Sequence, residues 1–305
     1  VSSSAPGVRP PTCVMFSTVS VADVPRVLTV HAHPDDESSK GAGTIAKYAD
    51  DGAATSLVCC TGGEAGDILN PVMDRPEIIE NLPAVRRDEL DRAAKVIGYD
   101  RVHWLGYRDS GMPDSEHNAH PENFANAPLE EAVERLVRII RAERPHVIVT
   151  YPDDQKGYRH PDHLRVYDIS VPAWEAAGDP AAFPAAGEPW TPLKLYYTTW
   201  SRARIEALHA LYGRLGLESP YTEDWFKRPS QDERITTKVD VAAWYQRRVD
   251  ALLAHETQVD PTSKFWFGLP HHEAAEAYPW DDYILAHSRV DTPTPEDDLF
   301  AGIFG

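Results

Sequence analysis

The sequence predicts an α/β fold in which helices cover both faces of a parallel sheet. From residue 26 onward, short runs rich in Val, Leu, Ile and Thr alternate with longer segments whose apolar residues recur at helical spacing. This alternation is typical of βαβ units, whose crossovers place helices on both faces of the sheet. In addition, titratable residues cluster directly after the apolar runs. Ligands of such sheets bind beyond the carboxyl ends of the strands, so these clusters indicate one common pocket.

The expected elements follow in order along the chain. We expect strands at 26–33, 54–60, 101–106, 146–151 and 193–200, and helices at 38–51, 84–98, 128–145 and from Pro161 onward. Ser38 or Ser39 can cap the first helix, and Gly52 can end it. Residues 61–83 form a Gly- and Pro-rich stretch that is too long for a plain connection, so it is a candidate functional loop.

The helical pattern loosens after Trp200. Segments 201–216 and 241–258 are expected to be helices, joined by aromatic and Pro-rich stretches. We therefore expect residues 25–305 to form a single catalytic domain, in which residues 200–305 are a cap or helical extension packed on the sheet. Residues 1–24 are rich in Pro and Ser and are expected to be a disordered leader.

Composition and charge narrow the classes of partner. The formal net charge of −18 argues against nucleic acid and anionic membranes, because these need clustered Lys and Arg. No run approaches the ~18 apolar residues of a spanning helix, and no secretory signal is evident. Three cysteines cannot form a disulfide framework for a chain of this size, so Cys59 and Cys60 are expected to be reduced thiols in or near the core. These features predict a cytoplasmic protein with a small-molecule ligand.

Two local pairs of potential metal ligands lie at the expected carboxyl edge. His33 and Asp36 are three residues apart across the turn after the first strand, and His160 and His163 are three apart in "HPDH". Pro161 suits the first turn of a helix, and residues three apart on a helix share a face. Each pair alone would more often be a helix start than a site, but their convergence on one pocket favours a catalytic metal with an open coordination position.

Asp35 and Asp36 cannot both face the same metal, because adjacent side chains diverge. One of them can ligate the metal while the other accepts a proton from water, which is the division that hydrolysis needs. A competing interpretation comes from "GAGTIA", which fits the dinucleotide pattern GxGxxA. That pattern requires its first Gly at the turn after the strand, whereas seven residues separate His33 from Gly41. We therefore interpret Gly41 and Gly43 as small residues that allow close packing of the first helix.

These motifs resemble the LmbE/PIG-L family of zinc-dependent deacetylases, whose mark is a strand followed by HPDD and a distant HPDH. The similarity extends through "HAHPDDESSKGAGT", "TGGEAGDILNP", "RRDEL", "WLGYRDSG", "GYRHPDH", "AAGD", "GEPW", "KLYY", "AHETQVDP" and "DDLFAGI". Over this span the chain is most similar to the branch of the family that cleaves mycothiol S-conjugates. The resemblance implies a Rossmann-like fold with one Zn²⁺ per chain, although Fe²⁺ suits the same ligand set.

The resemblance also implies a role for each residue of the motifs. His33, Asp36 and His163 would ligate the metal, and Asp35 would be the general base. His160 would stabilise the oxyanion or protonate the leaving amine, and Tyr158 would donate a hydrogen bond to the oxyanion.

Further residues are implied as substrate contacts. Arg86 and Asp109 match positions that bind the glucosamine–inositol portion, and Glu64 in "TGGEAGD" is a third expected contact. Lys40 follows "ESS" as in the amidase branch, so it can contact the cysteinyl substituent. The alternative is that Lys40 is a solvated lysine at a helix start.

The implied reaction is hydrolysis of the amide between glucosamine and the N-acetylcysteinyl group of a mycothiol S-conjugate. Lys156, Arg159 and the loop "MPDSEHNAHPENF" depart from the pattern of the detoxifying amidases. They indicate a specialised role in the biosynthesis of a sulfur-containing antibiotic such as a lincosamide. The alternatives are a detoxification amidase, an N-acetylglucosaminyl-inositol deacetylase, and a non-catalytic binding protein on the same fold. The complete set of metal ligands and general base argues against the binding protein.

Overall fold

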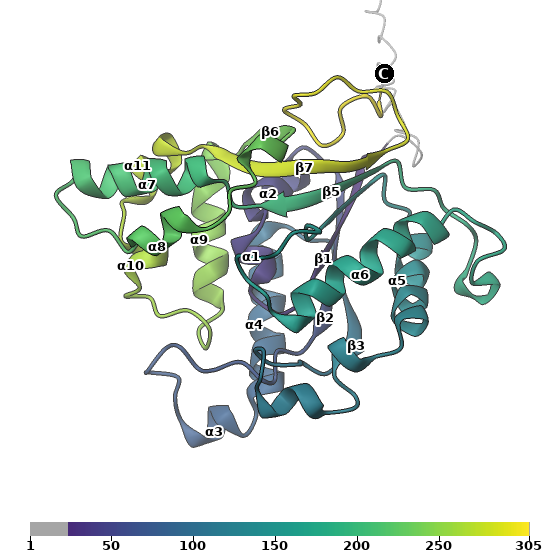
Figure 1. Cartoon of the computed structure of the whole chain (residues 1–305), viewed down its shortest axis with the longest axis horizontal. Coiled ribbons are helices and arrows are strands. Elements are labelled where there is room, and N and C mark those ends of the chain that lie inside the picture. The colour runs from purple at the N-terminus through teal and green to yellow at the C-terminus, as the bar shows by residue number, and fades with distance from the viewer. Residues whose placement is uncertain (1–23, 305) are drawn as a thin grey trace, which may run out of the picture.

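A twisted seven-stranded sheet runs through the centre of the protein, as the computed structural model shows for residues 24–304 (Figure 1). Its strands are β1 (Arg26–His31), β2 (Ala54–Thr61), β3 (Arg101–Tyr107), β4 (Val147–Thr150), β5 (Lys194–Thr199), β6 (Thr237–Asp240) and β7 (Trp280–Ser288). Their order across the sheet is β3-β2-β1-β4-β5-β7-β6. The leader expected at residues 1–24 lies, apart from its last residue, outside the described residues.

The five strands that the sequence predicted are all present and parallel. β1 pairs with β2 on one side and with β4 on the other. The strands that follow β1 are therefore added first toward β3 and then, from β4 onward, toward the other edge, so the strand order reverses between β1 and β4. The predicted α/β fold with a Rossmann-like sheet is thereby confirmed. In such a sheet the crevice for a ligand opens at the carboxyl ends of the strands beside this reversal, here after β1 and β4.

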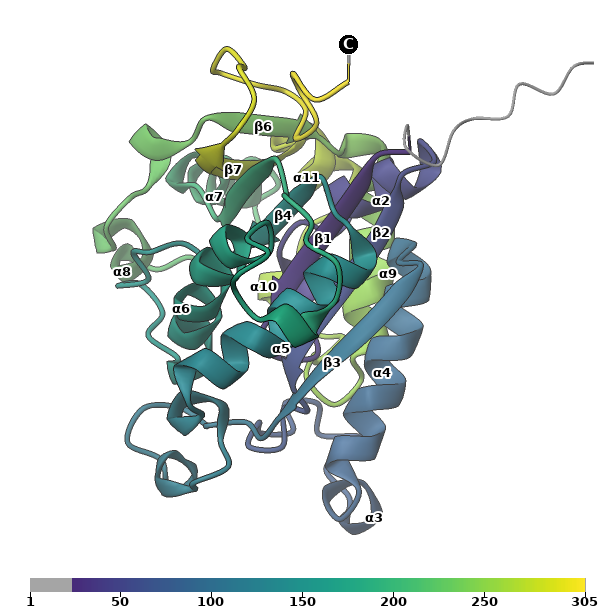
Figure 2. The same cartoon turned by 90° about the vertical axis from the view of Figure 1, so that its right-hand side faces the viewer.

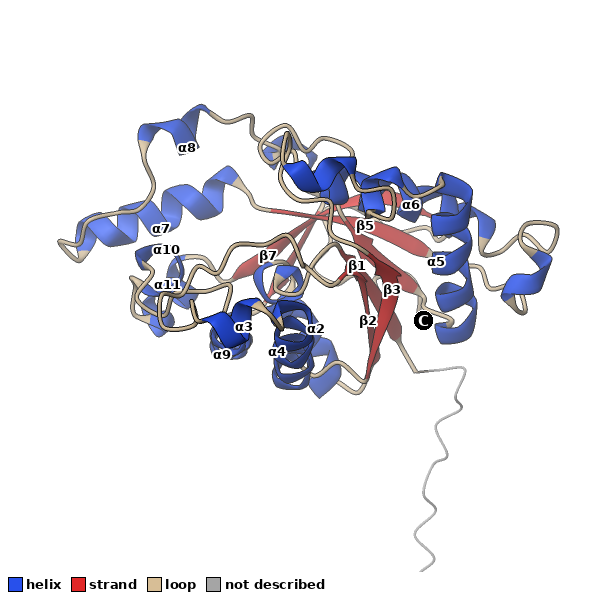
Figure 3. Cartoon of the chain, turned by 90° about the horizontal axis from the view of Figure 1, so that it is seen from below, coloured by secondary structure: helices blue, strands red, loops and turns tan. Residues whose placement is uncertain are grey.

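The helices cover both faces of the sheet. They are α1 (Asp36–Ser39), α2 (Ala42–Asp50), α3 (Pro76–Ile79), α4 (Leu82–Ile97), α5 (Leu129–Glu143), α6 (Pro161–Ala176), α7 (Arg202–Arg214), α8 (Glu223–Lys227), α9 (Tyr245–Ala254), α10 (Lys264–Phe267) and α11 (His271–Ala277). α5 and α6 lie on one face, and α2 and α4 lie on the other, where α9 runs beside α4 (Figures 2 and 3). A buried apolar cluster fills each of these two interfaces.

The first helical segment is broken where the sequence predicted one helix over 38–51. α1 ends at Ser39, and α2 begins after Gly41, whose φ of +85° lies in the left-handed region. A Cβ on Gly41 would lie 2.7 Å from the Tyr283 hydroxyl, so the close packing expected of this glycine is confirmed. The predicted capping by Ser38 or Ser39 is wrong, because both residues lie inside α1.

The segment after residue 200 is more than the helical extension that the sequence predicted. It adds β7, antiparallel to β5, and β6, antiparallel to β7, to the edge of the sheet. Its helices α7, α8, α10 and α11 gather at one side of the molecule (Figure 1). They share a third apolar cluster built around Leu208, Leu211 and Tyr212. We call these four helices the C-terminal lobe.

The structure also bears on the two adjacent cysteines and on whether any helix could span a membrane. Cys59 and Cys60 are free thiols in the buried part of β2, as predicted. None of the helices in the described part of the chain is long and apolar enough to cross a membrane.

Candidate active site

Loops from the carboxyl ends of β1, β3 and β4 meet around one cavity of about 650 Å³. The loop after β1 supplies His33, Asp35 and Asp36, and the loop after β3 supplies Asp109. The segment from β4 into α6 supplies Tyr158, His160 and His163 to the same cavity. The convergence expected from the sequence therefore occurs at the reversal point of the sheet.

Two histidines and one carboxylate form a buried group that could hold a metal ion. The nearest side-chain atoms of His33, Asp36 and His163 all lie within 4.8 Å of one another. Asp36 Oδ2 is 3.5 Å from His33 Nδ1 and 3.3 Å from His163 Nε2. Zn²⁺ and Fe²⁺ both accept two imidazole nitrogens and one carboxylate oxygen, so the chemistry of the donor set fits either ion.

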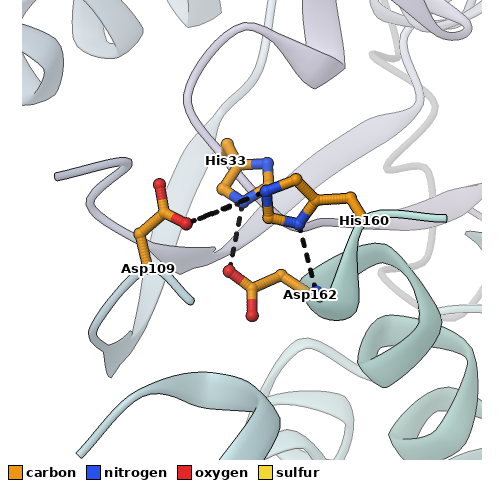
Figure 4. Close-up of side chains that lie close together, drawn as sticks. All are labelled: His33, Asp109, His160 and Asp162. Atoms are coloured by element: carbon orange, nitrogen blue, oxygen red, sulfur yellow. Dashed lines mark hydrogen bonds and ion pairs between the residues drawn. The ribbon is translucent and has the colours of Figure 1, made fainter. Parts of the chain in front are cut away.

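The orientation of His33 favours this metal group. Its Nε2 lies 3.2 Å from Asp162 Oδ2 and 3.5 Å from Asp109 Oδ1 (Figure 4), whereas Asp36 lies near the other ring nitrogen, Nδ1. A carboxylate that accepts the Nε2 proton keeps Nδ1 unprotonated and able to ligate a metal. Asp162 is in turn fixed by the backbone N–H of Ser110 at 2.9 Å and by its hydroxyl.

No role for Asp162 was predicted from the sequence, although this residue lies inside the HPDH motif. A second cluster, His33, Asp109, His160 and Asp162, is also close enough to surround an ion. Both of its carboxylates face the same nitrogen, His33 Nε2, and the backbone amides of Gly111 and Ser110 donate to them at 2.8 and 2.9 Å. We therefore assign this second cluster to the orientation of His33 and His160.

Asp35 occupies a strained turn beside the metal group. Its φ of 115° is unusual for a residue with a side chain, and such strain persists only where neighbouring contacts hold it. The Asp35 backbone N–H donates to Glu37 Oε2 at 2.9 Å, and its carboxylate lies 3.3 Å from the Arg86 guanidinium. Burial raises the pKa of Asp35 to about 6, although the charge of Arg86 opposes this shift. A carboxylate with a pKa in this range suits proton transfer near neutral pH.

His160 and Tyr158 occupy different depths of the cavity. His160 is buried at the start of α6, and its Nδ1 accepts the N–H of Asp162, so that its Nε2 lies 4.0 Å from Asp109 Oδ1. Tyr158 is half exposed, its ring centroid lies 5.0 Å from that of His163, and its hydroxyl faces the Met112 sulfur at 3.9 Å. His160 is thus held beside the metal group, while Tyr158 stands at the mouth of the cavity.

The four predicted substrate contacts differ in how free they are to bind a ligand. Arg86 is buried and donates to the carbonyls of Gly63 and Pro34 at 2.6 Å, in addition to its contact with Asp35. Arg86 and Asp109 line the cavity. Glu64 is not among the described residues that do so, and its carboxylate accepts the N–H of Asp109 at 2.9 Å.

The structure does not place Lys40 as a solvated lysine. Its ammonium group pairs with the Asp36 carboxylate and lies 5.6 Å from the centre of the Tyr151 ring. Burial alone would lower the pKa of Lys40, but the charge of Asp36 outweighs this effect and raises it. Lys40 therefore touches a predicted metal ligand at the wall of the cavity.

A buried ion pair joins α1, directly after the turn that carries Asp35, to the C-terminal half of the chain. His255 Nε2 lies 2.7 Å from Glu37 Oε1, and neither side chain is exposed. Burial would lower the pKa of His255, but Glu37 outweighs it and raises the pKa. From the sequence, Glu37 could cap the helix or contact a ligand, and His255 was expected at the surface or in the core. The only signal for either residue was that each lies in a segment that resembles the family.

Aromatic side chains of the C-terminal lobe, and one at the end of β5, also line the cavity. They are Trp200, Trp225, Phe265 and Trp266. The sequence did not predict this aromatic wall, because its members are separated by up to 66 positions and follow no motif.

A buried group of two histidines and a carboxylate, beside a second carboxylate in a cavity, defines a hydrolase of the metal-assisted kind. The chain belongs to the PIG-L family, whose model, described as GlcNAc-PI de-N-acetylase, matches residues 28–174. It is therefore an enzyme of the amidase and deacetylase class.

Relatives with assigned names match nearly the whole chain. A mycothiol S-conjugate amidase from Streptomyces coelicolor is 46% identical, over 93% of this chain and 99% of the relative. A 1D-myo-inositol 2-acetamido-2-deoxy-alpha-D-glucopyranoside deacetylase from Frankia alni is 39% identical, over 90% of this chain and 99% of the relative.

Solved structures with the same fold are more distant in sequence. N,N'-diacetylchitobiose deacetylase from Pyrococcus horikoshii has a TM-score of 0.59 at 18% identity, with 87% of this chain and 84% of that chain covered. GalB, a 4-carboxy-2-hydroxymuconate hydratase from Pseudomonas putida, has a TM-score of 0.56 at 15% identity, with 88% and 99% covered. Because a hydratase shares the fold, the reaction must be argued from the site.

Proposed function

We propose that this protein hydrolyses the amide between glucosamine and the N-acetylcysteinyl group of mycothiol S-conjugates. The products would be glucosaminyl-inositol and an N-acetylcysteine S-conjugate. The relative of known name at 46% identity supports this substrate, and the similarity extends over nearly all of both chains. The observation that carries the proposal is the cavity itself, in which Asp35 lies beside the buried metal group and the remaining space far exceeds what an acetyl group fills.

His33, Asp36 and His163 would hold the metal, with Zn²⁺ or Fe²⁺ compatible with the donor set. When bound, such an ion polarises the amide carbonyl and makes a water molecule more acidic. Asp35 would take the proton from this water, since its carboxylate is partly exposed to the cavity and is kept in place by Arg86.

His160 would give a proton to the leaving amine of glucosamine. Its Nδ1 already accepts the Asp162 N–H, which leaves Nε2 as the nitrogen that can carry and donate a proton. Tyr158 would donate from the mouth of the cavity to the developing oxyanion, an interaction that contributes about 2.7–4 kcal/mol when the donor is well aimed. Arg86 and Asp109, with Glu64 behind Asp109, would form the end that receives the glucosamine–inositol hydroxyls.

An N-acetylglucosaminyl-inositol deacetylase is the second candidate function. It is favoured by the similarity to the relative from Frankia alni, and it would use the same metal group and general base. The aromatic wall favours the amidase, because an acetyl group would leave that part of the cavity without a ligand.

We further propose a specialised biosynthetic role rather than general detoxification. Lys156, one of the residues that depart from the pattern of detoxifying amidases, lines the cavity, whereas Arg159 lines only an adjoining surface hollow. A time course would compare a simple drug–mycothiol conjugate with a mycothiol adduct of a sulfur-containing antibiotic precursor. Equal or faster turnover of the simple conjugate would contradict this role.

The amidase function is tested by product analysis on a mycothiol S-conjugate. We expect the metal-loaded protein to release a primary amine and an N-acetylcysteine S-conjugate in equal amounts. Chelation should stop the release, and addition of Zn²⁺ or Fe²⁺ should restore it. Absence of both products from metal-loaded protein would contradict the proposal.

A further inference from the structure

The aromatic wall of the cavity is a stack of rings. The Phe265 ring lies 5.8 Å from that of Trp200, with an angle of 17° between the planes, and 5.4 Å from that of Trp225, with an angle of 28°. Trp266 meets Phe265 edge to face at 4.8 Å. The Arg228 guanidinium lies 4.0 Å from the centre of the Trp225 ring, and the Arg204 guanidinium lies 5.1 Å from that of Trp200. All four rings are nevertheless only partly buried and line the cavity, so each keeps some surface that a ligand can reach.

The segment that carries Trp225 is held firmly in place. The Arg202 guanidinium donates to the backbone carbonyls of Phe226 and Arg228, one and three residues after Trp225. The Asp232 carboxylate accepts the backbone N–H groups of Arg202 and Ala203 at 2.7 and 2.9 Å. The wall is thus built before any ligand arrives, which reduces the entropy lost on binding.

The wall and the polar end of the cavity, which Arg86 and Asp109 line, adjoin different residues of the turn after β1. Trp200 Nε1 donates to the carbonyl of Ser39 at 3.3 Å, in the helix that begins with Asp36. Lys40 follows Ser39 directly and faces Asp36 Oδ1. The polar end lies instead beside Asp35, where Arg86 is in contact with its carboxylate.

An amide cleaved at the metal group must place its two halves on different sides of that group. The amine half of the proposed substrate is a polyol, and it suits the polar end around Arg86 and Asp109. The acyl half carries the sulfur and its substituent, and it must extend the other way, past Lys40 toward Trp200.

We propose that the aromatic wall is the binding site for the S-substituent and that it selects apolar, ring-bearing substituents. This inference rests on the proposed amidase function. Aromatic rings bury large areas and pair with other rings in stacked or edge-to-face geometry, so an aryl group gains more on this wall than a methyl group does. Selectivity therefore resides in the C-terminal lobe and Trp200, and the chemistry resides in the loops of the parallel strands.

The test compares the S-methyl and S-benzyl conjugates of mycothiol as substrates of wild-type protein, W225A and W225L. We expect wild type to cleave both and to favour S-benzyl. W225A should lower kcat/KM for S-benzyl by about tenfold, mainly through KM, and change that for S-methyl by less than about threefold. W225L, which restores apolar area without a ring, should fall between the two.

The matched control is W280A, because Trp280 is partly exposed on β7 and does not line the cavity. Thermal unfolding and metal content of each variant establish that the fold and the metal group remain intact. An equal loss on both conjugates would place the sugar half on the wall and overturn the inference, as would an unchanged ratio. Failure of the proposed function is a different result, in which wild type cleaves neither conjugate.

Discussion

Asp35 combines a strained backbone with a carboxylate that is held beside the metal group but does not belong to it. Asp35→Asn should therefore leave metal content unchanged and lower amide hydrolysis by about 10²–10⁴-fold, the usual contribution of a general base. Metal analysis and amine release on the same preparation check this. Asp51→Asn, on an exposed turn, is the control and should behave as wild type. Loss of metal together with activity would contradict the division of roles between Asp35 and Asp36.

The Glu37–His255 pair supports that strained turn, because Glu37 also accepts the N–H of Asp35. His255→Ala leaves a buried carboxylate without its partner, a change that costs about 3–5 kcal/mol of the free energy of unfolding. Urea denaturation of wild type and variant measures this loss in the free energy of unfolding. His209→Ala, at an exposed position on α7, should stay within about 0.5 kcal/mol of wild type. A cost for His255→Ala below about 1 kcal/mol would show that the pair does not hold the turn.

At the scale of residues, the sequence predicts what local spacing encodes. His33, Asp36 and His163 are found together because each lies in a short motif at the carboxyl end of a strand. Asp162 was missed because its partner His33 lies 129 positions away, and no spacing rule connects them. The same holds for Glu37 and His255, which are 218 positions apart.

At the scale of elements, Gly43 shows why α2 packs so closely on the segment after β6. A Cβ at this position would lie 2.7 Å from the Val241 Cβ, just beyond β6. Gly43→Ala should therefore lower the free energy of unfolding by about 1–3 kcal/mol, despite the higher helix propensity of alanine.

Gly213 provides the matched comparison for this change. It also lies in a helix, α7, but an added Cβ would meet nothing within 4 Å. Gly213→Ala should be neutral or should stabilise the protein by up to about 1 kcal/mol. Chemical denaturation of both variants tests the contrast, and equal effects would contradict the packing account.

The five parallel strands could be predicted because each is a short apolar run between turn signals. β6 and β7 could not be predicted in this way. β6 has only four residues, and β7 begins with Trp280, Asp281 and Asp282, so neither shows a clean apolar pattern. They are strands because the edge of the sheet at β5 offers unpaired backbone groups, a tertiary effect that overrides local propensity.

At the scale of the whole molecule, the cavity is assembled from two parts of the chain. The loops of the parallel strands supply the metal group and Asp35, the proposed general base, and the residues from Trp200 onward supply the aromatic wall. Hydrogen bonds join the parts, as where Thr257 donates to the Glu89 carboxylate at 2.7 Å and Asn70 donates to the carbonyl of Glu256 at 2.9 Å. Under the proposed function, the first part would supply the chemistry and the second part would set which amide is cut.

Competition between the two amides in one reaction distinguishes an amidase from a deacetylase most directly. Metal-loaded protein would receive equal concentrations of an aryl mycothiol S-conjugate and of N-acetylglucosaminyl-inositol, and the ratio of N-acetylcysteine conjugate to acetate released would be measured. That ratio equals the ratio of the two kcat/KM values. We predict that the conjugate is cleaved at least about tenfold faster, the equivalent of ~1.4 kcal/mol of transition-state stabilisation. Faster release of acetate would contradict the account and assign the protein to the deacetylases.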